Sequence, residues 1–258
     1  MAAAPPKAVQ RFARPKTVDE AVSNYFNCII YGRPGSGKTT AAATAPPPIL
    51  FLDCDQGLLC LKGIPDEMAQ KIGLNPKETY FEPIRSMDDM LQQIQRVARE
   101  NAASPGFWNT VVVDNLTELQ RVLLTDMLSA SERSIPTIQD WGVILLRVQK
   151  IVRLIRNLPC HTIFLAHERE DEHGIGPALS GRIEEELPGY VDLMARLTVI
   201  EREEDDAKGG KTIRTIRRLR CRESVSQKVK AKSRSFRIGE WEKPNLTTII
   251  KKCHNPQP

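Results

Sequence analysis

Apolar runs and helical patterns alternate along most of the chain. Four short runs rich in β-branched and aromatic residues predict strands that are buried on both faces, at residues 25–31, 49–53, 110–114 and 161–166. The segments between and after them predict helices at about residues 39–45, 87–102, 116–128 and 138–158. Because strands that alternate with helices are typical of a parallel sheet covered on both faces, we expect an α/β fold with a mostly parallel central sheet.

The ends of the chain follow other patterns. Residues 194–201 and 212–221 predict two strands joined by a polar turn, an antiparallel hairpin, and residues 238–250 predict further short strands. Residues 1–23 are rich in Pro and Ala and predict a flexible arm that could take part in oligomerisation. We find no internal repeat and no linker, so we expect residues 24–258 to form one domain.

Composition narrows the class of protein. The 258 residues are 41% hydrophobic and 27% charged, as in soluble globular proteins, and no apolar run approaches the roughly 18 residues of a membrane span. The six cysteines include no C-x-x-C pair, which favours reduced thiols in a cytoplasmic protein over a disulfide framework or a zinc site. Residues 211–258 hold 14 Lys and Arg against three Glu. This basic end indicates either a nucleic-acid partner or a solvated charged face.

Residues 32–39 read Gly-Arg-Pro-Gly-Ser-Gly-Lys-Thr, a full match to the phosphate-binding loop (P-loop) pattern G-x-x-x-x-G-K-[ST]. A predicted strand precedes the motif and a predicted helix follows it, which is the context that such a loop requires. We therefore expect this chain to bind ATP, with Lys38 on the β- and γ-phosphates and Thr39 on Mg²⁺. The expected nucleotide-binding residues are Gly32, Arg33, Pro34, Gly35, Ser36, Gly37, Lys38, Thr39 and Thr40.

Carboxylates at the ends of two predicted strands are candidates for catalysis. Asp114 ends the strand at residues 110–114 and is the expected partner of Thr39 in the metal site. Asp53 and Asp55 lie two residues apart at the end of the strand at 49–53, so both could face the site. They could instead cap backbone N–H groups in a turn, and the residues alone leave this open.

The order of these elements resembles the RecA superfamily of recombination ATPases. The resemblance implies a RecA-like P-loop core, in which Asp55 stands where the family has a water-activating Glu. It implies that His167 is the γ-phosphate sensor, where the family usually has Gln. It also implies that Lys230 and Lys232, in Val-Lys-Ala-Lys, reach the γ-phosphate of a neighbouring subunit. These lysines could instead belong to an exposed basic strand that binds DNA.

Residues 168–190 hold four glycines, two prolines and several acidic residues, and predict a long irregular loop. The resemblance implies a DNA-contacting loop here, although its acidic residues suit phosphates poorly. From this loop and the basic end, the candidate DNA-binding residues are Arg169, Arg182, Arg217, Arg218, Arg220, Lys228 and Arg234.

The compact size of the chain resembles phage-encoded RecA-like proteins of single-strand annealing, which work beside a single-strand-binding protein. We therefore expect a DNA-stimulated ATPase of recombination that acts on single-stranded DNA in the bacterial host cytoplasm, uses ATP and Mg²⁺, and assembles into a ring or filament. Two alternatives stay open. One is a motor or helicase loader in phage replication, and the other is a nucleotide-gated scaffold with negligible turnover.

Overall fold

A computed structural model describes residues 25–172, 174–180, 183–205, 211–222, 227–231 and 238–254. The predicted arm at residues 1–23 lies outside the described residues, as do residues 206–210 in the predicted hairpin turn. Among the described segments, no helix is both long enough and apolar enough to cross a membrane.

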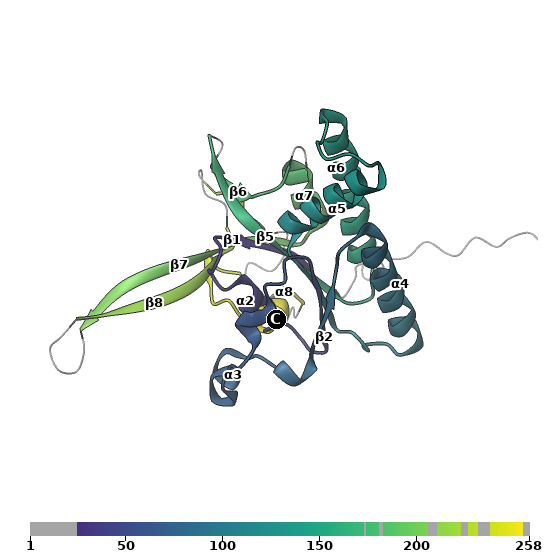
Figure 1. Cartoon of the computed structure of the whole chain (residues 1–258). Helices are drawn as coiled ribbons and strands as arrows, with labels where there is room; N and C mark the ends of the chain where they lie inside the picture. The colour runs from purple at the N-terminus through teal and green to yellow at the C-terminus, as the bar shows by residue number, and fades with distance from the viewer. Residues whose placement is uncertain are drawn as a thin grey trace, which may run out of the picture.

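The strands form one sheet in the order β10-β8-β7-β1-β5-β4-β2-β3 (Figure 1). At its centre, β1 (Asn27–Gly32) pairs in parallel with β5 (His161–Asp171) on one side and with β7 (Leu193–Asp205) on the other. Beyond β5, the sheet continues in parallel through β4 (Thr110–Asp114), β2 (Ile49–Asp53) and β3 (Thr79–Pro83).

The antiparallel part lies beyond β7. There, β8 (Lys211–Arg220) pairs with β7 along its whole length, and β10 (Trp241–Glu242) pairs with the end of β8. Two short strands join the sheet off this path, namely β6 (Gly174–Pro177) beside β5 and β9 (Lys230–Ala231) beside β7. The expected α/β class, with a mostly parallel central sheet and an antiparallel C-terminal extension, is confirmed.

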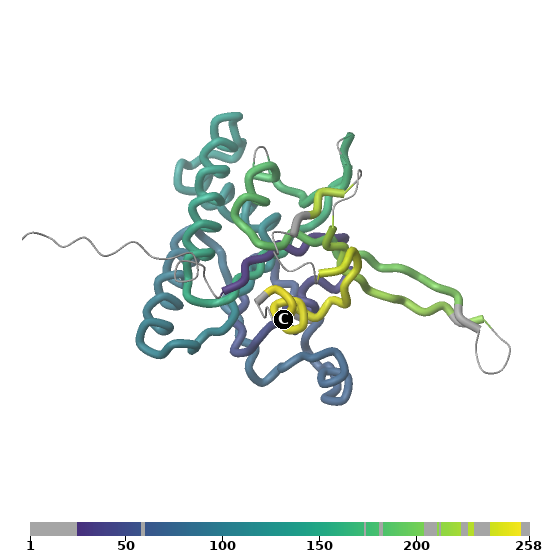
Figure 2. Tube along the Cα trace, turned by 180° about the vertical axis from the view of Figure 1, so that it is seen from behind, coloured from purple at the N-terminus to yellow at the C-terminus, as the bar shows by residue number. Residues whose placement is uncertain are grey.

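Helices cover both faces of the sheet (Figures 1 and 2). One face packs against α4 (Met87–Ala103), α5 (Leu116–Ala130), α6 (Ile138–Arg156) and α7 (Ile183–Tyr190). The other face packs against α2 (Lys38–Ala42), α3 (Asp66–Ile72) and α8 (Leu246–His254). Short 3₁₀ turns, η1 (Leu58–Leu61) and η2 (Pro76–Glu78), flank α3.

The central strands are apolar on both sides because both sides are covered. All the residues of β1 and β4 are buried, and alternate residues of β1 belong to different cores. Ile29 and Tyr31 pack under α4 to α7, whereas Cys28 and Ile30 pack against α2 and α8. This arrangement explains why the strands read as continuous apolar runs rather than as alternating ones.

Two segments differ from the prediction. Residues 168–190 are not a long irregular loop, because β5 continues to Asp171, turns back as β6, and is followed by α7. Ile183 and Leu187 are buried at helical spacing in the core, and this burial holds the helix in spite of Pro188 within it. In the described segment 238–250, which was predicted to form short strands, β10 is the only strand and residues 246–250 belong to α8.

Candidate functional site

The P-loop connects β1 to α2 at the carboxyl edge of the sheet. Gly37 has a φ of 96°, a backbone conformation that favours glycine. A Cβ on Gly32 would lie 2.6 Å from the carbonyl oxygen of Leu197, so only glycine fits there. Because α2 has only five residues, the N–H groups of the loop and of the first turn supply most of the positive potential, rather than a long helix dipole.

A cleft of about 760 Å³ opens in front of this loop. We call it the P-loop cleft, and its polar part is lined by Gly35, Gly37, Lys38, Thr39, Asp55, Asp114, Asn115, His167 and Arg217. The cleft is also lined by the apolar residues Ile64, Met68, Ile72 and Pro244. Polar and apolar groups in one cleft beside a P-loop suit the phosphates and the base of a nucleotide.

Lys38 lies along the loop that precedes it. Its Nζ donates hydrogen bonds to the carbonyl oxygens of Gly32 and Arg33, both at 3.0 Å. Burial lowers the pKa of this ammonium group, and the nearby carboxylates of Asp114 and Asp55 oppose that effect. The loop carbonyl oxygens therefore hold a largely buried cation in place.

Thr39 and Asp114 lie together, with Thr39 Oγ1 donating to Asp114 Oδ2 at 2.7 Å. Burial raises the pKa of Asp114 to about 6; the hydrogen bond from Thr39 lowers it, and the charges of Asp55 and Asp53 raise it. A buried carboxylate short of positive charge, beside a hydroxyl oxygen, fits Mg²⁺, which Thr39 and Asp114 would hold. Within the described ranges, no group of three or more His, Cys, Asp or Glu could hold a metal ion.

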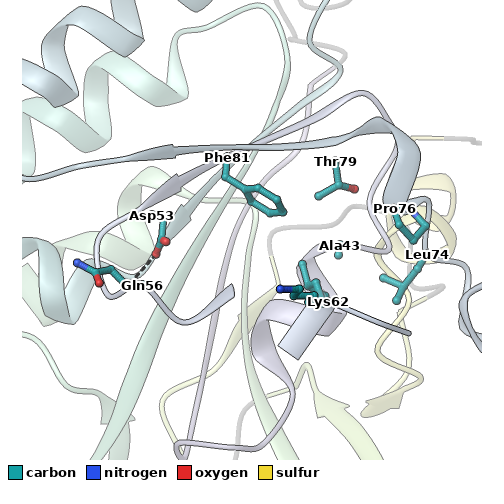
Figure 3. A pocket seen from close by; sticks show the side chains of 9 residues that line it. Ala43, Asp53, Gln56, Lys62, Leu74, Pro76, Thr79 and Phe81 are labelled. Atoms are coloured by element: carbon teal, nitrogen blue, oxygen red, sulfur yellow. Dashed lines mark hydrogen bonds between the residues drawn. The ribbon is translucent and has the colours of Figure 1, made fainter. Parts of the chain in front are cut away.

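The structure gives different surroundings to Asp53 and Asp55, whose roles the sequence left open. Asp53 caps the turn, because its Oδ1 accepts hydrogen bonds from the backbone N–H groups of Asp55 at 3.3 Å and Gln56 at 2.8 Å. Its side chain lines a neighbouring pocket of about 440 Å³ together with Phe81 (Figure 3). Asp55 also takes part in the turn, because its Oδ1 accepts a hydrogen bond from the backbone N–H of Gly57 at 2.8 Å. Unlike Asp53, it lines the P-loop cleft, and its Oδ2 accepts a hydrogen bond from Asn115 Nδ2 at 2.7 Å.

Sequence reasoning did not single out Asn115, which is buried at the centre of this group. Its Oδ1 accepts a hydrogen bond from the backbone N–H of Glu118 at 2.9 Å and caps α5. Its Nδ2 contacts Asp55, and it also lies 3.4 Å from Nε2 of His167. In the sequence, an Asn directly before a helix is interpreted as an ordinary N-cap. Its contacts with Asp55 and His167 arise only because three strands end close together.

His167 follows the buried part of β5, directly beside Gly32 of the P-loop strand. Burial lowers the pKa of its imidazole, and the charge of Lys38 lowers it further, so the ring is neutral near pH 7. Its Nδ1 is buried and has no hydrogen-bond partner among the described residues. Because His167 lines the P-loop cleft, its ring can contact a ligand there.

The predicted DNA-binding residues are dispersed. Arg169 and Lys228 both pair with the buried carboxylate of Glu184, at 2.6 and 2.7 Å. Arg220 pairs with Glu240 at 3.0 Å and stacks over Trp241. Arg217 lines the P-loop cleft, and Arg218, the next residue of β8, faces the opposite side of the hairpin. The backbone of Lys230 lies in β9, and Arg182, Lys232 and Arg234 fall outside the described residues.

A nucleoside triphosphate with its magnesium ion accounts for the buried lysine, for the pair of oxygen ligands and for the carboxylate and imidazole that face them across one cleft. This chain is therefore a P-loop ATPase. Residues 24–235 match the family described as an AAA domain, and the chain belongs to that family.

Other comparisons add less. No curated protein matches the chain. Among solved structures, the chain is similar to a KaiC-like protein from the hyperthermophilic archaeon Pyrococcus horikoshii OT3, with 15% sequence identity and a TM-score of 0.45. That match covers 76% of this chain and 78% of the other.

Proposed function

We propose that this ATPase binds single-stranded DNA and acts as an oligomer in homologous recombination or single-strand annealing. The observation that carries the proposal is the distribution of arginines on the β7–β8 hairpin. This hairpin extends away from the core (Figures 1 and 2). β1 pairs with β7 only as far as Arg196, and β10 pairs with β8 only at Leu219 and Arg220, so the outer strands pair with each other.

Opposite residues of an antiparallel ladder point to the same face. Arg202 lies opposite Arg214, and Arg218 follows two pairs further toward the core on that face. We call these three residues the arginine face. Like charges directly opposite each other destabilise a ladder, and an anionic partner bound between them would offset that repulsion. The other face carries Glu201 and Glu203 together with Lys211 and Arg217, so that face is mixed in charge.

An arginine face on a projecting ribbon suits a phosphate backbone. Phosphate contacts supply most of the sequence-independent affinity of nucleic-acid-binding proteins and leave the bases available for pairing, as annealing requires. The RecA resemblance favours single-stranded DNA as the natural polyanion. The same strand, β8, also carries Arg217 into the P-loop cleft, which gives DNA binding a direct structural route to the nucleotide.

The residues of the cleft support hydrolysis. Lys38 would bind the phosphates, and Thr39 with Asp114 would hold Mg²⁺, which neutralises charge on the transferred phosphoryl group. Asp55 would accept a proton from the attacking water, with its carboxylate oriented by Asn115. His167 would contact the γ-phosphate from the wall of the cleft.

Exposed apolar side chains on α6 support self-association. Ile138 is 93% exposed and Leu146 is 65% exposed, with Val143 between them in the chain. A second copy of this chain could bury these exposed apolar side chains, which are costly to leave in water. We also propose that Lys230 and Lys232 of a neighbouring copy complete the ATP site. Only the resemblance to the RecA superfamily supports this part of the proposal. Light scattering on wild type and Leu146→Glu tests the assembly, and a monomeric wild type at all nucleotide states would contradict it.

DNA binding is tested by fluorescence anisotropy with a labelled single-stranded oligonucleotide over a range of salt concentrations. For Arg214→Gln/Arg218→Gln, we expect at least about a tenfold loss of affinity at low salt and a salt dependence reduced by about two phosphate contacts. The matched control is Arg85→Gln/Arg99→Gln, which removes the same charge at the α4 end of the molecule and should stay within about twofold of wild type. Equal losses in both variants, or no binding by wild type at low salt, would contradict the proposal.

A further inference from the structure

Among the candidate DNA-binding residues that the structure describes, Arg217 is the one that lines the P-loop cleft. It lies in β8 opposite Val199 of β7, and its side chain points to the same face as Leu219. Leu219 is buried in the core that α2 covers, so this face of the strand is turned toward the P-loop. The alternation of the strand sends Arg218 to the other face.

The contacts of Arg217 with the loop are direct. Its Nε donates a hydrogen bond to the carbonyl oxygen of Ser36 at 3.1 Å. A Cβ on Gly37 would lie 3.2 Å from both Cδ and Nε of Arg217, so the arginine stem lies against the backbone that begins α2. Among the described residues, Arg217 has no carboxylate partner, whereas Arg33 and Arg196 are both paired with Glu168.

We propose that Arg217 binds the phosphates of the nucleotide held by its own P-loop, through the two terminal amino groups of its guanidinium. The contact of Nε with Ser36 fixes the stem and leaves those two groups exposed at the cleft. Lys38 is arranged in the same way, held by loop carbonyl oxygens while its charge faces the cleft. Two cations anchored to one loop give an anionic ligand more charge-assisted hydrogen bonds than Lys38 alone would give. This inference rests on nucleotide binding by the P-loop and not on DNA binding.

Glutamine at position 217 separates the two contacts of this residue. The amide nitrogen of Gln follows Cδ directly, as Nε of Arg does, so Arg217→Gln keeps a donor for Ser36 and removes only the charged end. Arg218→Gln makes the same change on the opposite face and is the matched control. Arg217→Lys restores the charge without the fork of donors.

The experiment measures dissociation constants for ADP and for a non-hydrolysable ATP analogue by calorimetry, with Mg²⁺ and without DNA. Thermal melting confirms that each variant is folded. We expect Arg217→Gln to weaken nucleotide binding about tenfold or more, Arg217→Lys to recover part of the loss, and Arg218→Gln to stay within about twofold of wild type.

Three results would overturn the inference. If Arg217→Gln binds nucleotide like wild type, the residue acts on the loop alone or not at all. If Arg218→Gln loses as much affinity, the effect is general electrostatics. If Arg217→Gln weakens binding of a single-stranded oligonucleotide in the absence of nucleotide and leaves nucleotide binding intact, Arg217 belongs to the DNA surface. Loss of DNA binding by Arg214→Gln/Arg218→Gln bears on the proposed function only, so the two ideas fail separately.

Discussion

The P-loop cleft and the β7–β8 hairpin differ in how tightly their side chains are packed and hydrogen-bonded. In the cleft, the side chains of Lys38, Thr39, Asp55 and Asn115 each have a hydrogen-bond partner, and they are carried by the ends of strands packed between two cores. In the outer hairpin, the described strands pair only with each other, and Ile213 is 64% exposed. A two-stranded ribbon has little stability of its own beyond its ladder.

This contrast predicts two kinds of mutational response. A change in the cleft alters distances among a few groups that act together, so single substitutions have large effects on chemistry. A change in the hairpin alters a sum of screened charges, so its effects are smaller, depend on salt, and leave the fold intact.

The largest expected effect is that of Lys38→Ala. Removing the cation that the loop holds should lower kcat/KM for ATP about a thousandfold, because two loop carbonyl oxygens fix this ammonium group where the phosphates would bind. Steady-state ATP hydrolysis measures this loss. Lys62→Ala is the control, since Lys62 lines the neighbouring pocket (Figure 3). A comparable loss in both variants would remove the distinction between the two pockets.

The next effect separates the two acids after β2. Asp55→Asn should lower kcat about a hundredfold with little change in ADP affinity, because the carboxylate accepts a proton and is not needed to hold the nucleotide. Asp53→Asn should mainly lower the melting temperature, because Asp53 caps the turn. The reverse pattern of losses would assign the chemistry to Asp53.

Substitution of Asp114 should change the free energy of unfolding in a way that depends on pH. Burial raises the pKa of this carboxyl from 3.8 to about 6, so the folded state binds its proton more tightly than the unfolded state does. The stability that the protonated Asp114 contributes below pH 4 is therefore lost as pH rises through about 6. In protein free of Mg²⁺ and nucleotide, Asp114→Asn should be more stable than wild type by about 2–3 kcal/mol at pH 7.5, and no more stable at pH 4.

Urea unfolding at both pH values checks this prediction, provided that both proteins refold. A wild type more stable than the variant at pH 7.5, or a difference that does not change with pH, would show that burial does not penalise the ionised carboxyl.

The smallest effect belongs to the hairpin. Lys211 and Glu203 form an ion pair at 3.0 Å in which both side chains are largely exposed. Lys211→Ala should change the free energy of unfolding by no more than about 0.5 kcal/mol, since water and salt screen such pairs. Thermal melting measures this change, and a loss above about 2 kcal/mol would mean that the hairpin is as tightly held as the cleft.

The same contrast explains what the sequence could and could not predict. The strands predicted at residues 49–53 and 110–114 match β2 and β4. A buried parallel strand is a continuous apolar run, so it can be recognised from its own residues alone. The P-loop can be recognised from the sequence because its backbone conformation requires glycine at fixed positions. The hairpin was also predicted, but the register that separates Arg217 from Arg218 is fixed only by pairing with β7.

The remaining differences come from contacts between distant segments. Asn115 contacts Asp55 and His167 only because three strands end at one edge. α7 forms in a glycine-rich segment because its apolar face packs on the core. α8 is held in part by the hydrogen bond from the backbone N–H of Leu246 to Thr44 Oγ1, at 2.8 Å, in the segment after α2. Local propensity does not encode such contacts.

The most direct test joins the two regions in one assay, which measures ATP hydrolysis against increasing concentrations of a single-stranded oligonucleotide. If the cleft and the arginine face belong to one DNA-dependent ATPase, wild type should show saturable stimulation. Arg214→Gln/Arg218→Gln should keep the basal rate and lose the stimulation, and Lys38→Ala should lose both. A wild-type rate that does not respond to DNA at low salt would leave a P-loop ATPase whose hairpin serves another partner.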